Sequence, residues 1–340
     1  MTQRVLHDRD ERGNDLGARR VNSFKPHTRI FEQHRNMMYG IAYRMLGSIS
    51  DAEDIVQDAY FRWSDTRLEQ IESPRRWLAT AVSRLCIDRQ RRKKIEKLCY
   101  TGPWLPEPVI TEGGGEDPEA GTSLAEEVSI AFLLLLERLT PLERAVFILK
   151  ETFDFVHEEV ADMLGIETAH SRQLFRRARN HLGEIPDSTH RLADPESRAV
   201  MQKFMTALMK QDIDGLRELL TDDIVAYSDG GGRVPAALIP LVGFDKVSRV
   251  FLHLAKTAAL PAESQWRIVN GAWALVYYVE GGIDTVTTAQ VEGGKIRRIF
   301  VIRNPAKLRH LPSRQTARNR RLTSIYGGPA LAPYHEIRGT

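Results

Sequence analysis

Apolar residues recur at helical spacing through the first third of the chain. Between residues 31 and 97 they mark the buried face of successive amphipathic helices. Asp51 opens one such helix. Ser73-Pro74 predicts the start of the next, from Arg75 to roughly Ile95, because serine caps helices and proline fits their first turn. The pattern predicts an all-α domain at residues 27–98.

A second helical stretch follows after a break. Residues 99–121 hold a high density of proline and glycine, which is typical of a linker between domains. Helical periodicity then returns, so we expect a second all-α domain at 123–184, after a linker at 99–122. Because such a linker is flexible, the two helical domains need not be fixed relative to each other.

The last third of the chain mixes helical and strand-like patterns. Helix-like stretches cover 196–210, 213–220 and 245–259. Apolar runs bounded by glycine turns predict strands at 224–227, 266–269, 274–279, 285–291 and 296–302. Helices followed by a meander of strands favour an α+β domain at 192–311 with one curved antiparallel sheet. We interpret residues 1–26 and 312–340 as a flexible arm and tail.

Composition narrows the environment in which the chain works. Cys86 and Cys99 are the only cysteines, and no apolar signal segment lies near Met1, so we expect a cytoplasmic protein without disulfides. No apolar stretch approaches the roughly 20 residues that span a bilayer, so we expect no membrane association. The net charge of +3 is too small to indicate a partner, and the placement of the positive charges matters more.

One segment predicts a helix-turn-helix at residues 155–182. A short apolar-faced helix is followed by Gly165, which supplies the left-handed conformation that only glycine adopts cheaply. Ile166 then fills the core, and a second helix begins at Thr168 or Ala169.

The second helix of this motif has a basic side without an acid, made of Arg172, Gln173, Arg176, Arg177 and Arg179. In a major groove, arginine pairs with guanine and glutamine with adenine, each giving about 1–3 kcal/mol of discrimination. The remaining arginines would neutralise phosphates. DNA recognition is the favoured interpretation. The alternative is a solvated basic face on an ordinary helical hairpin.

The helix that opens at Asp51 is rich in carboxylates, with Glu53, Asp54 and Asp58 following. Paired carboxylates can serve a metal ion or acid–base catalysis. However, Asp51 and Glu53 lie near the helix N-terminus, where the dipole favours negative charge anyway. No His or Cys supports a metal site there, so we expect neither a metal nor catalysis at this helix.

Residues 74–94 interleave aromatic and basic side chains. The basic residues from Arg84 to Lys94 suit a strand backbone, and Ser73 to Trp77 could border a pocket for an extruded base. Two alternatives remain open. In the first, Trp77 is a core residue and borders no pocket. In the second, the basic run is only the solvated end of a helix.

Together these segments resemble the extracytoplasmic-function (ECF) sigma factors, which direct bacterial RNA polymerase to promoters. The run 51–58 is similar to their region 2.2, which grips the clamp helices of the polymerase β′ subunit. Residues 73–92 resemble regions 2.3 and 2.4, which melt and read the −10 element. Residues 139–147 and the helix-turn-helix resemble region 4, which reads the −35 element.

The resemblance implies three sets of contact residues. Polymerase contacts are expected from Asp51, Glu53, Asp54, Gln57 and Asp58. Contacts to the −10 element are expected from Arg75, Arg76, Trp77, Arg84, Arg89, Arg91 and Arg92. Contacts to the −35 element are expected from His170, Ser171, Arg172, Gln173, Arg176, Arg177 and Arg179. The implied partners are core RNA polymerase, through its β′ clamp and β subunits, and promoter DNA.

The rest of the chain resembles a subgroup of these sigma factors, which carries a SnoaL-like domain of the NTF2-like fold. The matching motifs are Trp104–Pro108, Asp229–Arg233 and Asn304–Leu308. Two residues depart from the pattern: Arg233 replaces the commoner lysine, and Ala306 replaces the usual aspartate, which puts any ion pair of that aspartate in doubt. The expected fold is therefore two all-α domains followed by an α+β cone.

The resemblance implies that the third domain substitutes for a separate anti-sigma protein by docking on the first domain and the linker. The docking residues would be Trp104, Asp229, Gly230, Gly231, Gly232, Arg233, Asn304, Pro305, Lys307 and Leu308.

An enzyme is the serious rival for the third domain, because a cone-shaped fold encloses a pocket and relatives of this fold include cyclases and isomerases. The candidate residues are Tyr227, Asp229, His253, Tyr277, Tyr278 and Asp284. Their spacing indicates no His–Asp pair, so we favour regulation, with no catalytic residues, cofactor or metal. A third alternative is a sensor that binds a small apolar ligand in the cone.

Overall fold

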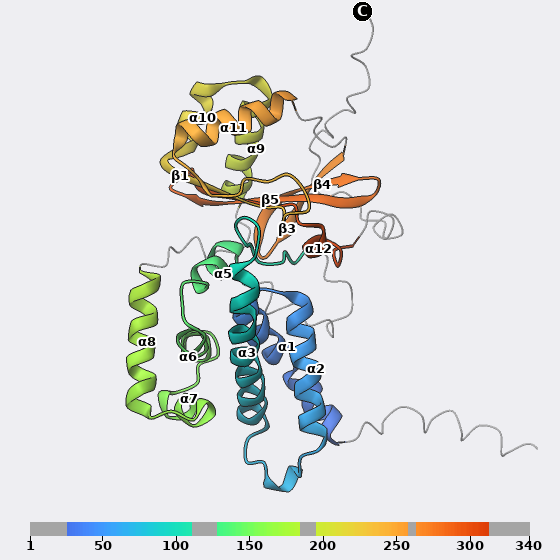
Figure 1. The fold of residues 1–340 in the computed structure, drawn as a ribbon, viewed down its shortest axis with the longest axis vertical. Helices are drawn as coiled ribbons and strands as arrows, with labels where there is room; N and C mark the ends of the chain where they lie inside the picture. Colours follow the sequence, from blue (N-terminus) through green and yellow to red (C-terminus); the bar gives the residue numbers. More distant parts are fainter. Residues whose placement is uncertain (1–25, 111–127, 184–194, 258–262, 313–340) are drawn as a thin grey trace, which may run out of the picture.

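The computed structural model describes residues 26–110, 128–183, 195–257 and 263–312. The predicted arm, the second half of the predicted linker and the predicted tail lie outside these residues. In the described part, a helical half and an α+β half are stacked end to end (Figure 1). None of the described helices is both long and apolar enough to cross a membrane.

The first helical unit contains α1 (Pro26–Leu46), α2 (Ile49–Ser64), a short 3-10 turn (Leu68–Gln70) and α3 (Pro74–Leu98). The Ser48 hydroxyl accepts from the Asp51 backbone N–H at 3.3 Å, so α2 begins two residues before the predicted Asp51. The Ser73 hydroxyl accepts from the Arg76 backbone N–H at 3.3 Å and caps α3, as the Ser-Pro signal predicts.

The second helical unit contains α5 (Ile130–Leu136), α6 (Pro141–Glu151), α7 (His157–Leu164) and α8 (Thr168–Leu182). Thr140 and Glu143 cap α6 reciprocally. Gly165 ends α7 in the left-handed region, with φ 67° and ψ 41°, and α8 follows after Ile166 and Glu167. The predicted helix-turn-helix is therefore present.

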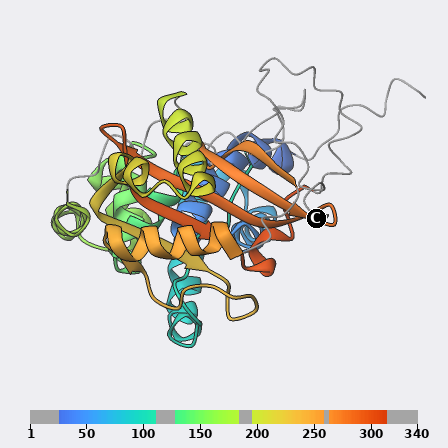
Figure 2. The same cartoon turned by 90° about the horizontal axis from the view of Figure 1, so that it is seen from above.

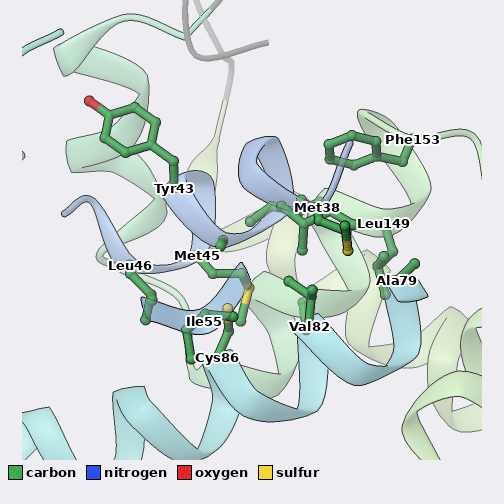
Figure 3. Close-up of a cluster of buried hydrophobic side chains, with 14 of the residues drawn as sticks. Met38, Tyr43, Met45, Leu46, Ile55, Ala79, Val82, Cys86, Leu149 and Phe153 are labelled. Carbon is green, nitrogen blue, oxygen red and sulfur yellow. The ribbon is translucent and has the colours of Figure 1, made fainter. Parts of the chain in front are cut away.

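The two helical units share one hydrophobic core. Leu149 and Phe153 of the second unit pack beside Met38 and Ala79 of the first (Figure 3). Arg144 reaches across to donate to the Met45 carbonyl at 2.8 Å. The linker composition alone does not require these domains to be fixed to each other, yet in this structure they are packed together. Proline and glycine content describes the connecting chain only, whereas small helical units still bury their apolar faces where a partner is available.

The third domain begins with α9 (Pro195–Lys210) and α10 (Ile213–Leu219), and α11 (Phe244–Thr257) interrupts its strands. The strands are β1 (Leu220–Asp229), β2 (Leu241–Val242), β3 (Glu263–Val269), β4 (Ala272–Val279), β5 (Gly282–Glu292) and β6 (Lys295–Ile302). A short helix, α12 (Pro305–Leu308), ends it. The strands form one sheet in the order β2-β1-β6-β5-β4-β3.

The sheet is mixed, which corrects the prediction of an antiparallel one. β6 returns beside β1 and pairs with it in parallel, while the other neighbours are antiparallel. Apolar and polar residues alternate along a strand in the same way whether its neighbour is parallel or antiparallel. The sequence pattern therefore did not indicate that β6 pairs with β1 in parallel.

The sheet separates two cores. Helices α9, α10 and α11 cover one face, around Phe204, Leu216 and Ile299 (Figures 1 and 2). On the other face, Phe300 and other strand residues pack against Leu105 of the linker and Ile130 of the second helical unit. The third domain is thus joined to the helical half by its sheet.

Candidate nucleic-acid interface and its interdomain clasp

Helix α8 presents its basic side to solvent. Six of the predicted −35 residues are exposed: His170, Arg172, Gln173, Arg176, Arg177 and Arg179. Arg172 pairs with Glu158 of α7 at 2.7 Å. Ser171 is the exception, because it is fully buried and its hydroxyl lies 3.0 Å from His157 Nδ1. Its assignment as a DNA contact is corrected: Ser171 fixes α8 against α7.

Helix α2 has an acidic outer face. Glu53, Asp54, Gln57 and Asp58 are exposed. Asp51 instead turns inward and is 5% exposed; Arg89 donates to its carboxylate at 2.9 Å, and Lys93 also pairs with it. Asp51 joins α2 to α3 and is not available to a partner, which corrects its place among the predicted polymerase contacts.

A cavity of about 480 Å³ lies where a base pocket was predicted. Ser73, Arg76 and Trp77 line it on the α3 side, and Asp162 and Met163 of α7 close it on the other. Trp77 is half-buried, with its ring tilted against that of Trp63 at 5.3 Å. Both interpretations of Trp77 therefore apply, because it packs on the core and also borders the cavity.

Two of the predicted −10 arginines are engaged by the second helical unit. Arg75 donates to the Phe153 carbonyl at 2.6 Å, and its guanidinium lies 4.1 Å from the centre of the Phe155 ring. Arg84 donates to the Met163 carbonyl at 2.8 Å. Among the others, Arg89 is held by Asp51, Arg76 pairs with Glu72 at 3.4 Å and Arg91 with Asp88 at 3.6 Å, while Arg92 is exposed.

The first half of the predicted linker lies against the third domain, and its contacts with that domain at two anchors are called the clasp here. The Asp229 anchor is the first. The Asp229 carboxylate is fully buried and accepts from Tyr100 at 2.6 Å, from the Leu105 N–H at 2.8 Å and from Lys307 at 2.7 Å. Lys307 also donates to the Leu105 carbonyl, and its ammonium lies 4.1 Å from the centre of the Trp104 ring. A buried ion pair is therefore built around the linker backbone.

Asn304 and the glycines complete this anchor. Asn304 caps α12 by accepting from the Ala306 N–H at 3.0 Å, and it donates to Tyr100 at 2.8 Å. A Cβ on Gly231 would stand 2.2 Å from the Asn304 amide nitrogen, so only glycine fits at this left-handed position. Burial and the hydrogen bond to Asp229 raise the pKa of Tyr100, so its hydroxyl stays a donor at neutral pH.

The Asn270 anchor is the second. Asn270 has φ 51°, and its side chain accepts from the Val109 N–H at 2.9 Å and donates to Tyr43 at 2.8 Å and to the Val128 carbonyl at 3.1 Å. Tyr43 in turn donates to the Glu107 carbonyl at 2.6 Å. One side chain thus joins the third domain, the linker and both helical units.

The linker also reaches the acidic helix α2. The Glu107 carboxylate accepts from the Ser48 hydroxyl at 3.0 Å and from the Ile49 N–H at 2.7 Å, and so it caps the N-terminus of α2. Trp104 lies against Gly47, where a Cβ would stand 2.6 Å from the indole ring. Residues 100–110 are therefore held on both sides, between the third domain and the first helical unit.

The comparisons with known proteins agree with this architecture. The family models for Sigma-70 region 2 and Sigma-70 region 4 match residues 30–95 and 129–182. The ECF RNA polymerase sigma factor SigJ of Mycobacterium tuberculosis is 36% identical over 84% of this chain and 94% of its own length. This chain is an ECF sigma factor.

The match to SigJ extends through the third domain of this sigma factor. The crystal structure of Mycobacterium tuberculosis SigJ covers 84% of the chain with 33% identity and a TM-score of 0.68. The ferric citrate uptake sigma factor FecI of Escherichia coli, at 29% identity, matches only 45% of the chain. The predicted family and fold class are confirmed, and the two helical units are hereafter called region 2 and region 4.

The sigma factor's docking motifs do not all act as predicted. Asp229, Gly231, Asn304 and Lys307 meet at the Asp229 anchor, and Leu308 packs in the core beneath it. The Arg233 side chain is exposed and makes no hydrogen bond or ion pair within the described residues. The docking role predicted for Arg233 is thus not seen.

Sequence reasoning missed the Asn270 anchor. Asn270-Gly271 is one of the glycine turns that bound the predicted strands, and Tyr43 lies within the helical stretch predicted at residues 31–97. A positive φ at asparagine is compatible with any exposed turn, so the sequence held no signal that distinguishes this turn from the others.

Among the candidate residues for an enzyme, His253 is paired with neither Asp229 nor Asp284 in the described part of this sigma factor. His253 is exposed on α11, whereas Asp229 lies with the linker beyond the other face of the sheet. Tyr227 stacks on Phe300, Asp284 pairs with Arg303 at 3.6 Å, and Tyr277 and Tyr278 are buried. Burial raises the pKa of Tyr277 to about 12. In the described part of the chain, no group of three or more His, Cys, Asp or Glu is placed to hold a metal ion.

Proposed function

We propose that this sigma factor is held in a closed state by its own third domain, and that promoter recognition requires region 4 to leave region 2. The observation that carries the proposal is the engagement of Arg75 and Arg84 by carbonyls of region 4. These bonds hold both side chains against region 4, which therefore covers the part of region 2 that we propose meets the −10 element. The −10 element is read by region 2 only after these bonds break.

The −35 and polymerase contacts are proposed from the exposed faces. Helix α8 reads the −35 element through Arg172, Gln173 and Arg176, with the neighbouring basic residues on phosphates. Core polymerase binds Glu53, Asp54, Gln57 and Asp58 on α2. Phe61 is 58% exposed and one helical turn beyond Gln57, so it extends this face as an apolar contact.

The third domain supplies the restraint. The Asn270 anchor bonds to residues of region 2, the linker and the start of region 4, so it resists their separation. This domain therefore acts in place of a separate anti-sigma protein, and it works by docking and not by turnover of a substrate.

Transcription in vitro with core polymerase tests the proposal. The full chain is compared with Asn270→Ala and with Tyr43→Phe, which remove bonds of the Asn270 anchor and leave the exposed faces intact. We expect several-fold more transcript from both variants than from the unaltered chain. Asn180→Ala, an exposed position on α8, is the matched control.

Two results would contradict the proposal. If the anchor variants are folded by circular dichroism yet give less transcript, the third domain promotes initiation and does not restrain it. If neither the full chain nor any variant stimulates the core enzyme, sigma activity itself is absent.

A further inference from the structure

A cleft of about 430 Å³ opens beside the Asp229 anchor, where the linker crosses the loop after β1. Thr101 and Gly102 of the linker form one wall, and residues 230–238 form most of the other. Sites for small molecules occupy about 300–1,000 Å³, so the cleft is large enough for a ligand of modest size.

The lining of the cleft combines one cation with hydroxyls and an apolar wall. Arg233 is the only charged side chain among the lining residues. Thr101 and Ser228 also line it, and their hydroxyls, like the Arg233 guanidinium, form no hydrogen bond within the described residues. Residues 234–238 add valine, proline, two alanines and Leu238, which is 66% exposed. These groups are not used by the clasp.

We propose that this cleft binds a small amphipathic anion, with a carboxylate or phosphate head on a short apolar body. The planar guanidinium of Arg233 pairs with the head, since arginine matches both oxyanions with two parallel hydrogen bonds. The Thr101 and Ser228 hydroxyls donate to the remaining oxygens of the head, and the apolar body lies along residues 234–238.

The bound anion stabilises the closed state. It contacts the linker and the third domain together, so it binds the docked arrangement more tightly than the released one and shifts the population toward it. This regulatory half of the proposal, that the anion stabilises the closed state, rests on the proposed function. The site itself rests on the cleft alone.

Binding is measured by titration calorimetry on the full chain with three probes: octanoate, octyl phosphate and the neutral octanamide. We expect saturable binding of an anion and none of octanamide at the same concentrations. Arg233→Gln weakens the binding roughly 10-fold or more, because it removes a charged hydrogen-bonding partner. Arg249→Gln, an exposed arginine on α11 outside the cleft, leaves it unchanged. The anion that binds more tightly shows which head group, carboxylate or phosphate, the cleft prefers.

Several outcomes would overturn the site: no saturable binding of either anion, equal affinity for octanamide, or unchanged affinity in Arg233→Gln. The regulatory half is tested by adding the better anion to the transcription assay, where it should lower the output of the unaltered chain but not of Arg233→Gln. Binding without that effect would remove the regulatory half and leave the site, whereas the Asn270→Ala result tests the closed state independently.

Discussion

Some polar residues in the recognition helices of this sigma factor make bonds inside the protein and do not reach its surface. Asp51 and Ser171 belong to the expected motifs, yet both point inward, because a helical motif places some of its polar residues on the buried side. Such residues form hydrogen bonds or ion pairs inside the protein, as Asp51 does with Arg89. A sequence motif therefore overstates the contact surface unless the buried positions of its helix are known.

The buried pair of Asp229 and Lys307 gives a stability prediction. Asp229→Ala leaves a lysine ammonium without its carboxylate in a nearly dry site, and breaking such pairs costs about 3–5 kcal/mol. We expect a clear fall in the melting temperature, measured by circular dichroism. The exposed Asp245→Ala serves as the control, and a fall no larger than that of the control would show that the pair does not hold the clasp.

At the scale of elements, helices and strands were predictable where one local pattern specifies them. The Ser73 cap and the Gly165 turn lie where the sequence placed them. Strand direction in the sheet and the position of the linker were not predictable, since both depend on partners distant in the sequence. Asp229 of β1 pairs with Ile302 of β6, 73 residues later, and Leu105 of the linker bonds to Asp229, 124 residues away.

Helix α8 gives a prediction about sequence recognition. Alanine at Gln173 or Arg176 should relax the preference at one −35 position, with about 1–3 kcal/mol less discrimination there, because these side chains are exposed on the outer face. Ser171→Ala should lower stability and leave the preference unchanged. Binding to a set of −35 duplexes at several salt concentrations distinguishes these cases. A uniform loss with a smaller salt slope would instead indicate a phosphate contact.

At the scale of the whole molecule, two phenols connect the halves: Tyr43, which is buried, and Tyr100, which is half-buried. Burial raises the pKa of Tyr43 and of Tyr100 above the ordinary value of about 10. The unfolded chain therefore loses these protons at a lower pH than the folded one. Their contribution to stability is complete below about pH 10 and is lost as the pH rises toward the folded-state pKa values.

We therefore expect unfolding in urea to become easier between about pH 9.5 and 11. The double variant Tyr43→Phe/Tyr100→Phe should lose less stability over the same interval, although it is weaker at neutral pH because both hydrogen bonds are gone. An identical pH dependence in the two proteins would assign the alkaline loss to other groups.

The bond between Tyr43 and Asn270 spans 227 residues, and this separation has a consequence for a newly made chain. A ribosome adds about 5–20 residues per second, so the partner of Tyr43 arrives roughly 10–45 s after it. Region 4 ends near residue 183, so for roughly the last 4–17 s of that interval regions 2 and 4 have both been made while the restraint does not yet exist. We expect each nascent molecule to have one early opportunity to bind polymerase. A higher rate of synthesis of this sigma factor should therefore raise transcription from its promoters without any other signal.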